Sequence, residues 1–106
     1  MKRGEVWWVN LDPSVGEEIK KQCPAVIASN DAANRHLNRV QVVPLTSKVG
    51  RIYPSEASAH FQERRGKAMA DQLSTVSKRR LINRGGQLSA QEMAGIEQAL
   101  RVQLGL

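Results

Sequence analysis

The feature that most constrains the fold is the order of the elements: several short strand-like segments come first, and one amphipathic helix comes last. The helix signal lies at the C-terminal end of the chain. Ser89 and Glu92 have the spacing of a capping box, in which the two side chains satisfy free backbone amides of the first turn. Met93, Ile96 and Leu100 then repeat at spacings of three and four residues, which places an apolar stripe on one helix face. The stripe predicts a helix that packs against a core.

The segments before the helix are rich in β-branched or apolar residues and are separated by glycine, proline or polar turn residues, as is typical of strands. They lie at residues 4–11, 24–29, 39–46, 55–62, 66–70 and 81–88. Short strands followed by one amphipathic helix predict a small antiparallel β-barrel with the helix packed against it. The sequence therefore predicts a fold that is mainly β with a C-terminal helix.

Local features refine this prediction. Pro44 lies inside the third segment, and because proline cannot donate a ladder hydrogen bond, it indicates an edge strand or a bulge. Residues 63–66 predict the turn of a hairpin. Asn30 and Asp31 are suited to cap a short helical turn that runs through Leu37. Residues 72–78 are ambiguous.

Length and composition bound the class of protein. The 106 residues suit a single domain, residues 1–106, that can bury its own core. The lone cysteine, Cys23, cannot form an internal disulfide, which fits a reducing compartment. No apolar run approaches the ~20 residues of a membrane span, and the N-terminal stretch MKRGEVWWVNLD lacks the pattern of a signal peptide. We therefore expect a cytoplasmic protein without a membrane segment.

The basic residues are concentrated in one part of the chain. The formal net charge is +6, and the window from residue 64 to residue 84 accounts for all of it, with seven Lys or Arg residues against Asp71 alone. Such a local excess attracts polyanions, chiefly nucleic acid, or an acidic protein segment. The alternative is a soluble surface that is basic without a partner. The clustering favours the polyanion.

Four separated segments share the order and spacing of one known family. They are RGEVWWVNLDPSVGEE at 3–18, KKQCPAVIASND at 20–31, VVPLTSKVG at 42–50 and KAMADQLSTVSKRRL at 67–81. With them the chain resembles, over essentially its full length, the MazF/PemK toxins of bacterial toxin–antitoxin modules. The resemblance implies a small SH3-like antiparallel β-barrel of the CcdB/PemK type, with a C-terminal helix, that forms a homodimer. It also implies a metal-free endoribonuclease that cuts single-stranded RNA such as mRNA at short sequences, without a cofactor, and a cognate antitoxin with an acidic disordered tail.

The resemblance further implies which positions form the site. The catalytic positions fall on Cys23 and Thr46. The positions that bind RNA fall on Glu18, Lys21, Ser47, Gln72 and Arg80, and no position is a metal ligand. One position departs from the pattern, because the residue before the proline is arginine in the family and is Cys23 in this chain.

This departure affects the chemistry. Metal-free RNA cleavage usually employs the neighbouring 2′-hydroxyl as nucleophile, so the protein must help to remove its proton, stabilise extra charge on the phosphate and assist the leaving 5′-oxygen. An arginine supplies charge to the phosphate through a bidentate fork, and Thr46 adds one oriented hydroxyl. Cys23 is shorter and only a weak donor. Since the loss of one electrostatic stabiliser typically costs on the order of 10²–10³ in rate, we expect a severely weakened or inactive nuclease.

Other roles for Cys23 have less support. A nucleophilic thiol needs a base, and neither His36 nor His60 stands in a recognised Cys–His spacing. No ligand spacing supports a metal site made of the same residues. A small side chain at the start of a strand is the simpler interpretation.

Two further functions and one structural question stay open. The same barrel can bind RNA or an acidic antitoxin without cutting. A gyrase poison of the CcdB type is disfavoured, because the segment from Val102 to Leu106 contains no aromatic residue. Trp7 and Trp8 either stack on RNA bases or fill a core or an interface, and we expect the second role for at least one of them.

Overall fold

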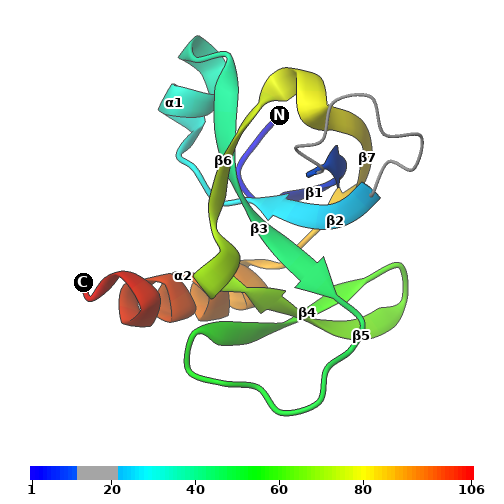
Figure 1. Cartoon of the computed structure of the whole chain (residues 1–106), viewed down its shortest axis with the longest axis vertical. Helices are drawn as coiled ribbons and strands as arrows, with labels where there is room; N and C mark the ends of the chain where they lie inside the picture. Colours follow the sequence, from blue (N-terminus) through cyan, green and yellow to red (C-terminus); the bar gives the residue numbers. More distant parts are fainter. Residues whose placement is uncertain (12–21) are drawn as a thin grey trace.

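The computed structural model describes residues 1–11 and 22–106 (Figure 1). Its elements in chain order are β1 (Glu5–Asn10), β2 (Gln22–Ile27), α1 (Asp31–His36), β3 (Arg39–Thr46), β4 (Glu56–Phe61), β5 (Arg64–Met69), η1 (Ala70–Gln72), β6 (Ser74–Ser77), η2 (Lys78–Arg80), β7 (Leu81–Gln87) and α2 (Ala90–Leu104). Within these residues the strands form one curled antiparallel sheet in the order β4-β5-β3-β2-β1-β7, with β6 paired to β3. The α2 helix packs against β4 and η1. The predicted fold, mainly β with a C-terminal helix, is confirmed, and the strands curl into an antiparallel half-barrel.

The β3 strand lies in the interior of the sheet and changes its partner along its length. Its first half pairs with β6, its middle pairs with β2, and its end pairs with β5. Pro44 pairs with Ala25 of β2, but on the other side of β3 the pairing to β6 ends at Val42 and the pairing to β5 begins at Leu45. The missing donor of Pro44 is tolerated because it falls in this gap. The prediction of an edge strand was therefore wrong.

The strands separate two buried apolar clusters. The first cluster lies between the sheet and α2 and contains Val6, Val26 and Ile96 among its members. The second lies on the opposite face of the strands and contains Val9, Ala25 and others. Successive side chains of β1 and β2 therefore pack into different clusters. This explains why apolar residues occupy both odd and even positions of these strands.

The start of α2 is fixed by the predicted capping box. Ser89 Oγ accepts a hydrogen bond from Glu92 N at 3.1 Å, and Ser89 N donates to Glu92 Oε1 at 3.0 Å. Glu92 Oε2 also accepts a hydrogen bond from His60 N at 2.6 Å, which connects the helix to β4. The cap therefore sets the position of α2 against the sheet as well as its first residue.

The structure differs from the sequence prediction at three boundaries. The hairpin turn lies at Gln62 and Glu63, which have φ values of 52° and 60°, and not at residues 63–66. The β2 strand begins at Gln22, two residues earlier than expected, so Cys23 belongs to the strand. The ambiguous residues 72–78 contain the end of η1 and all of β6.

Asn30 caps α1 as predicted, since its side chain accepts a hydrogen bond from Ala33 N. No helix in the described residues is long and apolar enough to cross a membrane.

We expect Ser89→Ala to lower the free energy of unfolding by about 1 kcal/mol, because an N-cap hydroxyl is worth this amount in typical helices. Urea denaturation followed by far-UV circular dichroism measures the change. Ser58→Ala, an exposed serine on β4, is the control and should change the same free energy by less than about 0.5 kcal/mol. Equal effects of the two substitutions would contradict a role for the cap.

Candidate functional site

Thr46 and Ser47 lie where β3 ends, and both line a cavity of about 300 Å³. We call it the Thr46 cavity. Its apolar lining includes Trp8, Pro24, Leu45 and Phe61. Its polar lining consists of Thr46, Ser47, Gln62, Arg64 and Arg65. Two of the predicted site residues thus share one cavity with arginines and aromatic rings that the resemblance did not assign.

Two glycines allow the close packing around this cavity. The Trp8 and Phe61 rings meet edge to face, with 5.5 Å between their centroids. A Cβ at Gly85 would lie 2.8 Å from Phe61 Cζ, so a side chain there would push the ring away. A Cβ at Gly66 would lie 2.6 Å from the carbonyl oxygen of Thr46. Gly66 therefore lets β5 approach the end of β3 and close one side of the cavity.

The loop at residues 47–55, which follows Thr46, is held by a largely buried ion pair. Lys67 Nζ donates to Glu56 Oε1 at 2.9 Å and to the carbonyl oxygen of Arg51 at 3.0 Å. Tyr53 N also donates to Glu56 Oε1, at 2.9 Å. The hydrogen bond from Tyr53 N, together with that from Lys67, lowers the pKa of the Glu56 carboxyl. Since Lys67 is the ladder partner of Thr46, the ion pair fixes the loop directly beside the predicted catalytic threonine.

Gln72 and Arg80 lie in a second cavity of about 480 Å³, which we call the Arg80 cavity. Leu11, Pro44 and Val76 also line it. Arg80 Nη1 donates to the carbonyl oxygen of Asn10 at 3.1 Å, and Gln72 Nε2 lies 3.5 Å from Met69 Sδ. The structure therefore divides the predicted site residues into two groups, one in each cavity.

Cys23 lies on β2 and is not among the residues that line either cavity. It is half-buried, carries a free thiol and pairs with Val9 of β1. Strand alternation places it on the same face as Ala25, whereas the next residue, Pro24, lines the Thr46 cavity. Neither histidine supports a reactive thiol, because no hydrogen bond joins Cys23 to His36 or His60 in the described residues. His60 Nδ1 instead lies 3.4 Å from the Glu92 carboxylate.

Two predicted site residues and the question of a metal site remain. Glu18 and Lys21 lie outside the described residues, so their roles stay predictions. Within residues 1–11 and 22–106, no group of three or more His, Cys, Asp or Glu side chains is placed to hold a metal ion.

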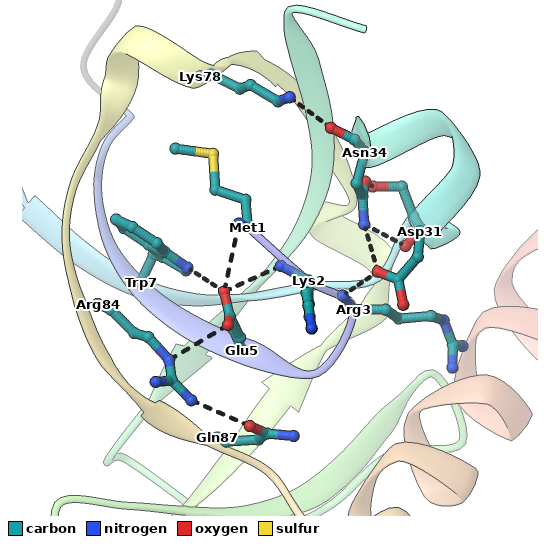
Figure 2. A network of polar contacts seen from close by, with 11 residues as sticks. Met1, Lys2, Arg3, Glu5, Trp7, Asp31, Asn34, Lys78, Arg84 and Gln87 are labelled. Carbon is teal, nitrogen blue, oxygen red and sulfur yellow. Dashed lines mark hydrogen bonds and ion pairs between the residues drawn. The ribbon is translucent and has the colours of Figure 1, made fainter. Parts of the chain in front are cut away.

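The basic window of the sequence does not form one surface. Lys67 is 9% exposed and paired with Glu56, so it adds little charge to the surface that would attract a polyanion. Arg84 Nε pairs with Glu5 at 3.5 Å, in the polar network of Figure 2. Arg64 and Arg65 are exposed beside the Thr46 cavity. The window therefore contributes charge at separate places, and part of it is internal.

The same network shows what the first tryptophan of the pair does. Trp7 packs against the second apolar cluster, and its Nε1 donates to Glu5 Oε1 at 3.0 Å (Figure 2). Burial alone would raise the pKa of Glu5, but hydrogen bonds from Lys2 N and Trp7 and the charge of Arg84 outweigh it, so the pKa is lowered. Trp7 thus has the structural role that the sequence favoured, whereas Trp8 lines a cavity.

Comparisons with known proteins agree on one family. The family model described as "PemK-like, MazF-like toxin of type II toxin-antitoxin system" matches residues 2–104. The chain is 38% identical to the endoribonuclease MazF9 of Mycobacterium tuberculosis, over 100% of the chain and 98% of the relative. It is 32% identical to the endoribonuclease toxin MazF of Escherichia coli K12, over 96% of the chain and 92% of the relative.

Solved structures give the same result. An endoribonuclease from a Mycobacterial species, in complex with its cognate antitoxin, matches with a TM-score of 0.84 at 30% identity and covers 100% of this chain and 96% of that one. MazF from Deinococcus radiodurans matches with a TM-score of 0.82 at 26% identity, over 100% of this chain and 97% of that one.

We expect Lys67→Met to lower the free energy of unfolding by about 1–3 kcal/mol at pH 7, because Glu56 keeps its charge and loses its partner. The pH dependence has a definite sign. Because the folded-state pKa of Glu56 is lowered, its ionised carboxylate stabilises the folded protein at pH values above the reference pKa of 4.5. This stabilisation is lost as the pH falls through the folded-state pKa. The difference between parent and variant should therefore shrink below about pH 4.

Two controls accompany this measurement, which uses urea denaturation across the pH range. Glu56→Gln combined with Lys67→Met should be more stable than Lys67→Met alone, since no unpaired charge remains. Arg65→Met, an exposed arginine on the same strand, should change stability by less than about 0.5 kcal/mol. A Lys67→Met effect that does not vary with pH would argue against the ion pair.

Proposed function

Because this chain belongs to the PemK-like, MazF-like family of type II toxins, we propose that it is the endoribonuclease toxin of a toxin–antitoxin module. It cuts single-stranded RNA such as mRNA without a metal ion, and Cys23 weakens or abolishes the cut. The observation that carries the proposal is the match to named endoribonucleases over essentially the whole chain. The position of Thr46 and Ser47 in a cavity with two exposed arginines adds support.

The cut proceeds by attack of a 2′-oxygen on the adjacent phosphorus while the bond from phosphorus to the 5′-oxygen breaks. The 2′-hydroxyl loses its proton to a base, and the leaving 5′-oxygen gains one. Between these events the phosphate oxygens carry extra negative charge, which donors and cations must stabilise. Thr46 Oγ1 accepts a hydrogen bond from Lys48 N at 3.2 Å. Its hydroxyl proton is therefore available to donate to a phosphate oxygen.

The missing component is a guanidinium at position 23. Cys23 lies on β2 next to Pro24, which lines the Thr46 cavity, so an RNA strand bound at Thr46 passes close to it. A half-buried thiol provides no fixed charge to a phosphate there. Arg80 places a guanidinium at the end of β1, but its hydrogen bond to the Asn10 carbonyl oxygen holds it against the backbone. At position 23 this chain therefore lacks the fixed charge that the family pattern supplies.

The partners follow from the same family. We propose that the protein forms a homodimer in the cytoplasm and binds a cognate antitoxin whose acidic, largely disordered tail competes with RNA. The solved relatives include endoribonuclease–antitoxin and MazE–MazF complexes. Val102, Leu104 and Leu106 at the C-terminal end are exposed apolar residues, as expected of a chain that buries part of its surface against another.

One observation, Cys23 itself, favours a second candidate function. If arginine at this position is indispensable, the chain is a module that binds RNA or an antitoxin and cuts nothing. The CcdB-like activity on gyrase has less support, since the relatives that match this chain are named endoribonucleases.

The test is the substitution Cys23→Arg, assayed on a mixed-sequence single-stranded RNA in EDTA. We expect the revertant to cut about 10²–10³ times faster than the parent, because one electrostatic stabiliser is restored. Cys23→Met is the matched control: it lengthens the side chain without adding charge and should cut no faster than the parent. Thr46→Ala in the revertant should slow cleavage.

Three results would count against parts of this proposal. Cleavage by the parent at the rate of the revertant would refute the role of the missing guanidinium. Binding without cleavage by both proteins would favour the non-cleaving module. An unchanged rate for Thr46→Ala would remove Thr46 from the chemistry.

A further inference from the structure

We propose that the Thr46 cavity holds one unstacked nucleobase of the bound RNA and helps to select its identity. The inference rests on the proposed function, because it requires a single-stranded RNA at the end of β3. Single-stranded RNA is usually recognised through bases that are splayed out, stacked on aromatic rings and hydrogen-bonded along their edges. The Thr46 cavity offers each of these elements from a different part of the fold.

The apolar surface comes from rings on three strands. Trp8 of β1, Pro24 of β2 and Phe61 of β4 line the cavity, and all three are only half-buried. Aromatic rings of this size are normally covered in a core or in an interface. Here the edge-to-face contact of Trp8 and Phe61 holds both rings at the surface, where a base can pack against them.

Polar groups for a base edge are present on the same cavity. The indole N–H of Trp8 lies beside Gly85 of β7, which does not line the cavity, and donates no hydrogen bond within the described residues. Gln62 is exposed at the hairpin turn and also lines the cavity. Its side-chain amide has donors and an acceptor, so it can distinguish the edges of different bases.

The cationic side of the cavity indicates a ligand that carries phosphates. The side chains of Arg64 and Arg65 make no ion pair or hydrogen bond with a described residue, and both are exposed. Two other cations of the basic window form ion pairs, Lys67 with Glu56 and Arg84 with Glu5. Glu63 is the acidic neighbour of the two arginines in sequence, and it is also exposed. Uncommitted guanidinium groups beside an aromatic cavity suit the phosphates that flank an inserted base.

An apolar side chain of the antitoxin is the competing occupant. The free arginines would also attract an acidic peptide, but Thr46 at the edge of the cavity favours the base. A base in the cavity places its own phosphate beside the hydroxyl that the reaction needs. The experiment below separates the two occupants.

The test is a double-mutant cycle between protein and RNA. The RNA is a single-stranded oligonucleotide of about ten nucleotides that spans a site cut by the Cys23→Arg revertant, a length within the range of known single-strand sites. Its bases are replaced one at a time by abasic residues, and binding is measured with the parent protein. Removal of the inserted base should weaken binding about 5- to 100-fold. Phe61→Leu should weaken binding of the intact RNA by a similar factor and should be insensitive to that one abasic replacement.

Two further variants make the result interpretable if Phe61→Leu folds poorly. Gln62→Ala lies on an exposed turn and should reduce the preference among the four bases at the same RNA position. Arg64→Gln combined with Arg65→Gln should weaken binding and its salt dependence. The control pair is Arg35→Gln with Arg39→Gln, two exposed arginines away from the cavity, and it should have a smaller effect on both. Circular dichroism and thermal melting establish that each variant is folded.

The outcomes distinguish this inference from the proposed function. If the revertant cuts RNA but the penalties of Phe61→Leu and of every abasic replacement are additive, the cavity does not hold a base, and the proposed function is unaffected. If Phe61→Leu leaves RNA binding unchanged and weakens binding of the cognate antitoxin, the cavity belongs to the protein partner. If neither protein binds or cuts RNA, both proposals are wrong.

Discussion

The rest of the structure depends on the path of β3. This strand pairs with β6 at its start, with β2 in its middle and with β5 at its end. It therefore connects the two halves of a curled sheet. Because β3 exchanges one neighbour for another around Pro44, its last residue emerges between the β2 strand and the β4–β5 hairpin. Both cavities border this crossing: Pro44 lines one, and Leu45 and Thr46 line the other.

Local sequence signals were sufficient for the elements that depend on local interactions. The capping box of α2 was predicted to the residue and the cap of α1 to one of two adjacent residues, because each involves hydrogen bonds between groups three positions apart. The hairpin turn was misplaced, since Gln62 and Glu63 adopt positive φ without the glycine that usually indicates it. The path of β3 was missed for a different reason. A proline within a strand indicates that one backbone hydrogen-bond donor is missing. Only the folded sheet shows that, in the part of the chain that the structure describes, β3 has no paired strand on one side at Pro44.

The candidate site was predicted in part for similar reasons. Thr46 and Ser47 are adjacent in sequence and meet in one cavity, and Gln72 and Arg80 meet in the other. The sequence did not indicate that Phe61 and the arginines of the hairpin join the first group, because their approach depends on strand pairing far along the chain. It also counted Lys67 as a surface charge. Only the fold shows that Glu56 pairs with Lys67. The lysine therefore stabilises a loop and contributes little to the charge of the surface.

Gly85 has a consequence for how proteins of this kind can diverge. It lies on β7 and contacts the ring of Phe61, where an added Cβ would be 2.8 Å from Cζ. A single change to alanine would therefore displace the ring and reshape the cavity from behind, without altering a residue that a ligand touches. Ligand preference could then shift while the outward-facing residues of the hairpin stay the same. Two relatives with identical cavity-lining residues need not recognise the same ligand, and position 85 should be compared before specificity is transferred between them.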